Sequence, residues 1–151
     1  MAFDKNAWQR ERRKANGNAD TLKYERTKHG KLMRIYRNMK SRIEGVQKEK
    51  FHLYRGKYLL PKDEFYTWAM MQPEFHRLFR EWVESGYERK LAPSVDRIDS
   101  SIGYRPWNMQ WVTHSENSRR GSVSKARLRE ESIGRSQACY VPAGPDIAEA
   151  A

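Results

Sequence analysis

The sequence is short of the residues that build a large core. Leucine, isoleucine, valine and phenylalanine supply only 25 of the 151 residues. A content this low, combined with high charge, is typical of chains that are disordered over part of their length. Tryptophan, tyrosine and methionine make up some of the deficit, and most of the large apolar and aromatic residues lie between Phe51 and Thr113. We therefore expect one compact domain in the middle of the chain, with thinner flanks.

Cysteine and long apolar runs are also scarce. The single cysteine, Cys139, excludes an intramolecular disulfide framework and a structural zinc site built on two or four cysteines. No apolar run approaches the roughly 20 residues that a membrane helix needs, and the stretch from Met1 to Lys14 is too charged for a signal peptide. We expect an intracellular, cytoplasmic protein in a reducing compartment, with no membrane partner.

Acidic residues are too few to balance the basic ones. The chain has 30 Lys and Arg against 19 Asp and Glu, a formal charge of +11. Residues 1–60 hold 17 of the basic and 6 of the acidic residues, so this segment carries the whole excess and the remainder is neutral. Concentrated positive charge favours a polyanionic partner. A basic tail that only keeps the chain dispersed is the alternative.

Charge and apolar pattern divide the chain into three parts. Residues 1–30 form a basic arm, polar and rich in Lys, Arg and Asn, in which we expect short helical pieces interrupted near Gly17. Residues 31–121 hold the domain. Residues 122–151 offer one weak helical stretch and a flexible tail, whose last fifteen or so residues we expect to be disordered.

Periodicity predicts several helices in the domain. The first has a 3.6-residue apolar period that ends at Gly45, formed by Leu32, Ile35, Tyr36, Met39 and Ile43. Its opposite face carries Arg34 and Arg37, which we expect to contact DNA. Two further helices are expected, over residues 62–71 and from Pro73 to Gly86. Between them and the first helix, residues 51–60 suit either a short hairpin or a loop with aromatic anchors.

The segment from Leu91 to Gly121 predicts strand, loop, strand and helix, in that order. Residues 94–99 and 109–113 favour strands. Thr113 followed by Glu116 three residues later is a capping box, so a helix should begin at this point. The expected fold class is therefore α+β, mostly helical, with a small ββα unit.

This unit can bring two oxygen ligands together. Asp96 lies on the first strand and Asn117 falls in or just after the first turn of the helix. A carboxylate and an amide oxygen suit a hard cation such as Mg²⁺ or Mn²⁺, and two protein ligands leave room for water and phosphate oxygens. Alternatively, Asp96 pairs with a nearby arginine and Asn117 caps the helix or faces solvent.

The same segment resembles the HNH endonuclease family, also called ββα-metal or His-Me finger nucleases, in the form found among phage and intron-encoded members. The matching motifs span about thirty residues: Asp96-Arg97-Ile98-Asp99, Gly103-Tyr104, Pro106-Trp107-Asn108, Trp111-Val112-Thr113 and Glu116-Asn117. The resemblance implies that Asp96 and Asn117 bind one divalent cation, and that Asn108 braces the loop and orients the base.

Arg97 departs from the family pattern, because most members have there the histidine that deprotonates the attacking water. A guanidinium cannot act as a base near neutral pH, although it could hold the scissile phosphate. Two candidate bases remain. Tyr104 lies across the loop, where Arg97 and a cation could lower the pKa of its phenol, or it is a packed aromatic. His114 has the more suitable intrinsic pKa, or it points to solvent.

Other polar residues of the motif have simpler expected roles. Asp99 should form an Asx-type turn that shapes the loop. Arg119 and Arg120 suit phosphate contacts, though solvated arginines are equally ordinary.

Taken together, these features predict a divalent-metal-dependent DNA endonuclease that hydrolyses phosphodiester bonds. A non-catalytic DNA-binding protein on a degenerate HNH scaffold is the main alternative, supported by Arg97. An RNA-binding accessory protein would explain the charge but not Asp96, Asn108 and Asn117.

Overall fold

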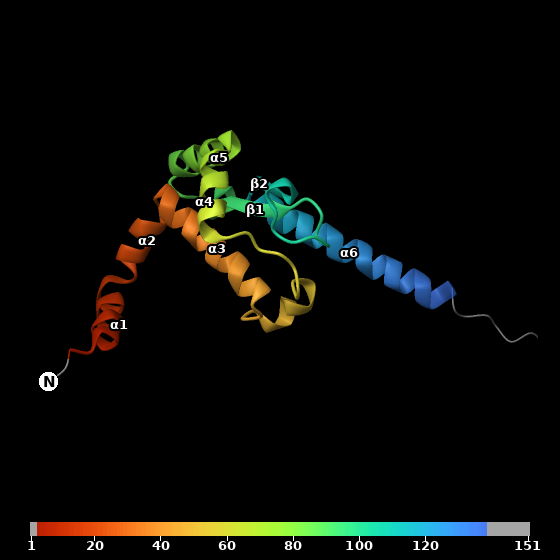
Figure 1. The fold of residues 1–151 in the computed structure, drawn as a ribbon, viewed down its shortest axis with the longest axis horizontal. Helices are drawn as coiled ribbons and strands as arrows, with labels where there is room; N and C mark the ends of the chain where they lie inside the picture. The colour runs from red at the N-terminus through yellow and green to blue at the C-terminus, as the bar shows by residue number, and fades with distance from the viewer. Residues whose placement is uncertain (1–2, 139–151) are drawn as a thin grey trace, which may run out of the picture. The chain divides into compact units, whose positions relative to one another are not determined.

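The computed structural model describes residues 3–138. Helices dominate this part of the chain, and its only sheet is an antiparallel pair of strands. The elements follow in the order α1 (Lys5–Asn16), α2 (Ala19–Glu25), α3 (Lys28–Ile43), the 3-10 helix η1 (Lys48–Leu53), α4 (Lys62–Met70), α5 (Pro73–Glu84), η2 (Arg89–Leu91), β1 (Pro93–Arg97), η3 (Pro106–Asn108), β2 (Met109–Thr113) and α6 (His114–Ala138) (Figure 1). This composition agrees with the predicted α+β class. Within the described residues, none of the helices has the length and apolarity needed to cross a bilayer.

The chain divides by its internal contacts into two units, residues 1–117 and residues 118–151. The first unit contains the arm, the core, the sheet and the first turn of α6. The sequence predicts boundaries after residues 30 and 121 instead. The ββα segment therefore belongs to the first unit as far as Asn117.

The basic arm forms two helices, as the broken periodicity predicts. The Asp4 carboxylate begins α1 by accepting from the backbone amides of Asn6 and Ala7, and Gly17 ends it in the left-handed conformation. Neither α1 nor α2 buries a side chain. These helices therefore present nearly all their basic residues to solvent.

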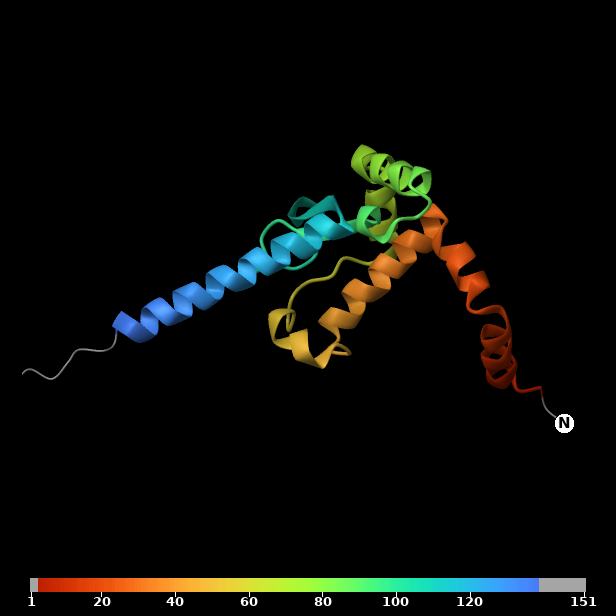
Figure 2. The same ribbon diagram turned by 180° about the vertical axis from the view of Figure 1, so that it is seen from behind.

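Helix α3 begins and ends where its sequence signals predict. The Thr27 hydroxyl accepts from the Gly30 amide at 3.0 Å, and Gly45 follows the helix with a φ of +79°, a conformation that glycine adopts without strain. Leu32 and Met39 lie on the buried face. After α3 the chain turns through η1, which contacts it, and continues towards α4 (Figure 2).

The possible hairpin over residues 51–60 is wrong. This segment forms η1, a turn and an extended stretch, and its strand-like pairing is a single bridge between Leu59 and Tyr104. The Tyr104 amide donates to the Tyr58 carbonyl at 2.7 Å, and the Leu60 amide donates to the Tyr104 carbonyl at 3.3 Å. A side chain at Gly103 would collide with the Tyr58 backbone. The alternative prediction, a loop with aromatic anchors, describes the segment better.

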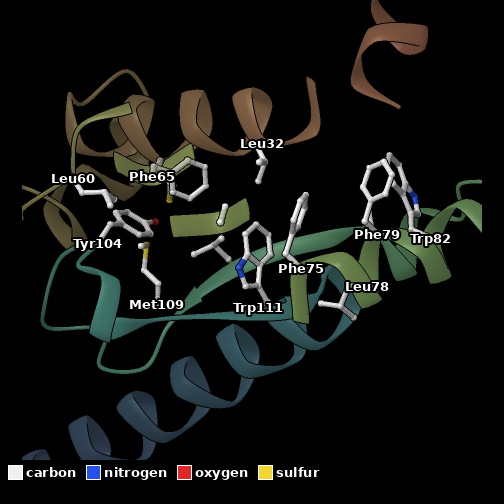
Figure 3. Close-up of a cluster of buried hydrophobic side chains, with 14 residues drawn as sticks. Leu32, Leu60, Phe65, Phe75, Leu78, Phe79, Trp82, Tyr104, Met109 and Trp111 are labelled. Carbon is white, nitrogen blue, oxygen red and sulfur yellow. The ribbon is translucent and has the colours of Figure 1, made fainter. Parts of the chain in front are cut away.

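The core joins the helices to the inner face of the sheet. Trp111 of β2 stacks on Trp68 of α4 with ring centroids 5.8 Å apart. The centroid of its ring lies 4.7 Å from that of Phe75 on α5. Helix α5 buries one stripe of four large side chains: Phe75, Leu78, Phe79 and Trp82. Figure 3 shows the core running from Trp82 at one end to Leu60, Tyr104 and Met109 at the other.

Helix α6 is longer than the sequence predicts. A weak helical stretch over residues 124–131 was expected after Gly121, whereas one helix runs from His114 to Ala138. The hydroxyls of Ser122 and Ser124 donate to the carbonyls four residues earlier, at 3.1 and 3.0 Å, which is the usual side-chain bond of a serine inside a helix. A glycine inside a helix costs only about 1 kcal/mol, so it does not have to end one. The expected disordered tail falls largely outside the described residues.

Candidate active site

The two strands form a short ladder whose register sets the site. Pro93 pairs with Thr113, Asp96 with Gln110, and Arg97 with Met109. Side chains alternate between the two faces of a strand. Val95, 5% exposed, faces the core, so Ser94 and Asp96 occupy the opposite face. We call this the polar face of β1.

The beginning of α6 lies against this polar face. Thr113 caps the helix, accepting from the Glu116 amide at 3.2 Å, as the capping box predicts. Asn117 follows one residue later, and its Nδ2 donates to the Ser94 hydroxyl at 2.7 Å and to the Val95 carbonyl at 3.2 Å. These bonds fix the Asn117 carboxamide beside the residue that precedes Asp96.

The chemistry of this pair fits a hard divalent cation. Both bonds to β1 use the Asn117 nitrogen, which leaves Oδ1 as the carboxamide atom that could bind a metal. The Asp96 side chain is partly exposed, and its Oδ2 accepts from Gln110 Nε2 at 3.2 Å. Over residues 3–138 there is no group of three or more His, Cys, Asp or Glu residues suited to a metal. A cation here would therefore take few ligands from the protein and complete its shell with water or phosphate oxygens.

Ser94 and Gln110 position this pair, and the sequence analysis missed both. Ser94 holds Asn117, and Gln110 holds Asp96. Strand alternation contained the signal, because Ser94 lies two residues before Asp96 and Gln110 is a polar residue opposite it in an antiparallel pairing.

Asn108 braces the loop between the strands, as the resemblance implies. Its side chain is 1% exposed. Its Oδ1 accepts from the Asp99 amide at 2.9 Å, and its Nδ2 donates to the carbonyls of Asp99 and Gly103, both at 3.0 Å. Asn108 thus satisfies backbone groups at both ends of the loop. Its orientation of a catalytic base stays a prediction.

The expected Asx-type turn at Asp99 is present. Its Oδ1 accepts from both the amide and the hydroxyl of Ser101, at 2.8 and 2.6 Å. These two bonds lower the pKa of the Asp99 carboxyl, with smaller contributions from Lys57 and Arg97. Asp99 therefore shapes the loop while it remains ionised.

Arg97 directs its guanidinium to the loop and to an aromatic ring. Its Nη1 donates to the Ile102 carbonyl at 3.2 Å, and the guanidinium carbon lies 4.4 Å from the centre of the Tyr54 ring. By alternation, Arg97 is on the face of β1 opposite Asp96. The structure thus gives Arg97 other partners than the Asp96–Asn117 pair, and its contact with the scissile phosphate stays a prediction.

The structure contradicts the expected environment of Tyr104. The side chain is 2% exposed and belongs to the hydrophobic core. Burial raises the pKa of its phenol, against the opposing influence of Arg42 and Arg97, whereas the proposed role required a lowered pKa. Its hydroxyl accepts a hydrogen bond from Arg42 at 3.3 Å. We therefore correct the assignment of Tyr104 as general base: it is a packed aromatic.

His114 lies at the other end of β1 from Asp96. Its side chain is exposed, and its backbone amide donates to the Ala92 carbonyl at 2.9 Å. Ala92 precedes Asp96 by four residues, which in a strand corresponds to about 13 Å. His114 is thus distant from Asp96 along the strand, although it precedes Asn117 by only three residues on α6, so its role as a base stays a prediction.

The four arginines predicted to bind DNA occupy different settings. Arg34 and Arg37 are exposed on α3, and Arg34 forms an ion pair with Glu25 at 2.5 Å, which offsets part of its charge. Arg119 and Arg120 lie on α6 in the second unit, and both have interactions of their own. Their contact with DNA stays a prediction.

Comparison with known proteins adds no support for a family. No family model, curated protein or solved structure matches the chain. The resemblance to HNH endonucleases therefore rests on the motif residues themselves.

Proposed function

We propose that the chain is a divalent-metal-dependent DNA endonuclease related to the HNH type. The observation that carries the proposal is the attachment of Asn117 to β1 by its amide nitrogen, beside Asp96. It supports a ββα unit in which a strand carboxylate and a helix carboxamide share one cation. The N-terminal excess of positive charge supports a polyanionic partner.

The residues of the unit have distinct roles in this proposal. Asp96 and Asn117 would hold Mg²⁺ or Mn²⁺, with Gln110 and Ser94 orienting them. When bound, the cation would supply Lewis-acid assistance to phosphodiester hydrolysis. Asn108 would keep the loop closed over the end of β1.

A non-catalytic DNA-binding protein is the second candidate, and one observation favours it. Of the two side chains considered as general base, Tyr104 is buried and His114 lies about four strand residues from Asp96. Arg97 cannot take over that role. These features would be found in a protein that keeps the ββα fold but lacks a general base near Asp96.

Supercoiled plasmid separates the two candidates. The full-length chain is incubated with plasmid in Mg²⁺, in Mn²⁺ or in EDTA, alongside Asp96→Ala and the carboxylate control Asp63→Ala, which changes an exposed residue of α4. An endonuclease nicks or linearises the plasmid only when metal is present. The Asp96→Ala variant should lose this cleavage, and the Asp63→Ala control should keep it. If the chain binds the plasmid but leaves it supercoiled with every metal, the non-catalytic DNA-binding protein is the better description.

The DNA partner has its own test in the arm. Deleting residues 1–17 removes α1, which buries no side chain, so the free energy of unfolding should change little. Duplex affinity should fall, and its dependence on salt should become shallower, because each phosphate contact contributes about 0.9 to the log–log slope. An unchanged slope would mean that α1 is a solubilising segment.

A further inference from the structure

A second group of polar side chains lies on the core side of β1, away from the Asp96–Asn117 pair. It consists of Arg97 of β1, Arg42 of α3, Lys57 of the segment before α4, and the rings of Tyr54 and Tyr104. The two rings are nearly parallel, with centroids 6.4 Å apart. We call these five residues the basic–aromatic cluster.

Two of its cations lie against the same rings, and the third lies beside the loop that follows β1. The guanidinium of Arg97 lies 4.4 Å from the centre of the Tyr54 ring, and that of Arg42 lies 5.8 Å from it. Arg42 also donates to the Tyr104 hydroxyl. Lys57 completes the group by donating to the Ser100 carbonyl at 2.7 Å, in the loop that Arg97 also contacts.

None of these three cations makes an ion pair within the described part of the chain; their partners are carbonyl oxygens, a hydroxyl and rings. Asp99 is the carboxylate close enough to act on Lys57 and Arg97 through space, and its own oxygen is bonded to Ser101. The Nε of Arg42 is buried without a hydrogen-bond partner. The cluster thus holds more positive than negative charge.

The cost of holding positive charge here falls on Lys57. Burial, and then the neighbouring charge of Arg97, lowers the pKa of Lys57. Burial alone would also lower the pKa of Arg42, and the two tyrosines reverse that effect. Neutral partners such as hydroxyls, carbonyls and rings leave the net charge in place, so an anion would stabilise the group.

We propose that Arg42, Lys57 and Arg97 form a binding site for one backbone phosphate of DNA, distinct from the phosphate placed at Asp96 and Asn117. Arginine offers a planar pair of donors to phosphate, and lysine adds a point charge. The site rests on the proposed DNA partner and is independent of cleavage. Its function is to fix the register of the duplex against β1, the strand that carries Asp96.

Duplex binding in EDTA tests the site without cleavage. The double variant Lys57→Gln/Arg97→Gln is compared with Lys50→Gln/Arg55→Gln, which removes the same charge from exposed positions of the same segment. Affinity for a 30-base-pair duplex is measured by fluorescence anisotropy over a range of KCl concentrations. The cluster variant should flatten the log–log slope by about 0.9, the loss of one phosphate contact, and the control by less than half of that.

Equal slopes for the cluster variant and the control would overturn the proposal, because the effect would then be general charge. Asp96→Ala serves as a third protein: it should bind as the parent does, even where it cannot cleave. The plasmid assay with metal tests cleavage and the present assay in EDTA tests binding, so failure of the nuclease proposal is visible separately from failure of this site.

Dimethyl phosphate provides a second readout if the parent does not bind the duplex. Titrating dimethyl phosphate into the parent should shift the Nε signals of Arg42 and Arg97 in NMR spectra. The Nε signal of Arg55 should stay unchanged. Unshifted signals would overturn the site.

Discussion

The two faces of β1 offer opposite chemistry. On the polar face, Asp96 and the Asn117 carboxamide present oxygens suited to a cation. On the other face, Arg97 joins Arg42 and Lys57 around tyrosine rings and presents donors suited to an anion. Asp96 and Arg97 are neighbours in the sequence and belong to different surroundings. If the resemblance to HNH nucleases holds, Arg97 thus takes the position of their usual histidine without taking its surroundings.

The largest expected effect is on the polar face. Asp96→Ala should lower metal-dependent cleavage by about 100-fold or more, because even outer residues of metal sites cost 10–100-fold when removed. Asn117→Asp, which keeps an oxygen at that position, should retain more activity than Asn117→Ala. Cleavage rates at saturating Mg²⁺ test this, and undiminished turnover by Asp96→Ala would remove the metal pair from the proposal.

Among these variants, the largest loss in the free energy of unfolding should come from a change in the loop that joins the two strands. Asn108→Ala removes three hydrogen bonds: the Asp99 amide and carbonyl lose a part-buried partner, and the Gly103 carbonyl loses a buried one. We expect a loss of about 2–4 kcal/mol in the free energy of unfolding, measured by urea denaturation. Asn38→Ala on the exposed face of α3 is the control and should stay within about 0.5 kcal/mol.

On the core side of β1, Tyr104→Phe should have only a small effect on stability and on cleavage. The ring stays packed, and the lost bond to Arg42 should cost about 1 kcal/mol of stability. Cleavage should remain within several-fold of the parent, because a buried phenol with a raised pKa is not the base. A 100-fold slower variant with unchanged DNA binding would restore Tyr104 to the mechanism and contradict the division between the faces.

The smallest expected effect is on proton binding within the cluster. Burial and the charge of Arg97 hold the pKa of Lys57 below its usual value, so the charged ammonium is less favourable in the folded chain than in the unfolded one. Stability should therefore rise as the pH increases from the folded pKa of Lys57 towards its unfolded pKa. Arg97→Gln should raise the folded pKa, which an NMR titration of labelled lysine would detect. No change would show that burial alone sets it.

Local signals in the sequence predicted much of the fold. The capping box placed the start of α6 after Thr113, and Pro73 placed the start of α5, because both act through their own backbone neighbours. The resemblance likewise assigned the brace to Asn108, which the structure bears out, whereas its pairing of Asp96 with Asn117 around a cation stays a prediction. These residues interact within one ββα unit, where spacing along the chain is a guide to spacing in the fold.

Features that depend on distant packing were missed. The segment over residues 51–60 suited a hairpin by its own pattern, but its backbone pairs with Tyr104 instead. Tyr104 suited a catalytic loop residue, but its ring lies among Leu60, Met109 and the rest of the core. Nothing in the sequence indicated that Lys57 and Arg42 approach Arg97, because only the folded chain brings these residues together. Such contacts are fixed by the tertiary fold and leave no periodicity to read.

The close approach of Gly103 to the Tyr58 backbone limits how this unit can be transplanted. The loop between β1 and β2 is held from outside by residues 58–60, which supply an amide and a carbonyl that the ββα segment lacks. A chimaera that moved only residues 91–117 into another protein would leave the Tyr104 ring and the loop backbone uncovered. The smallest portable cassette therefore begins upstream of Tyr54 and includes the intervening helices α4 and α5.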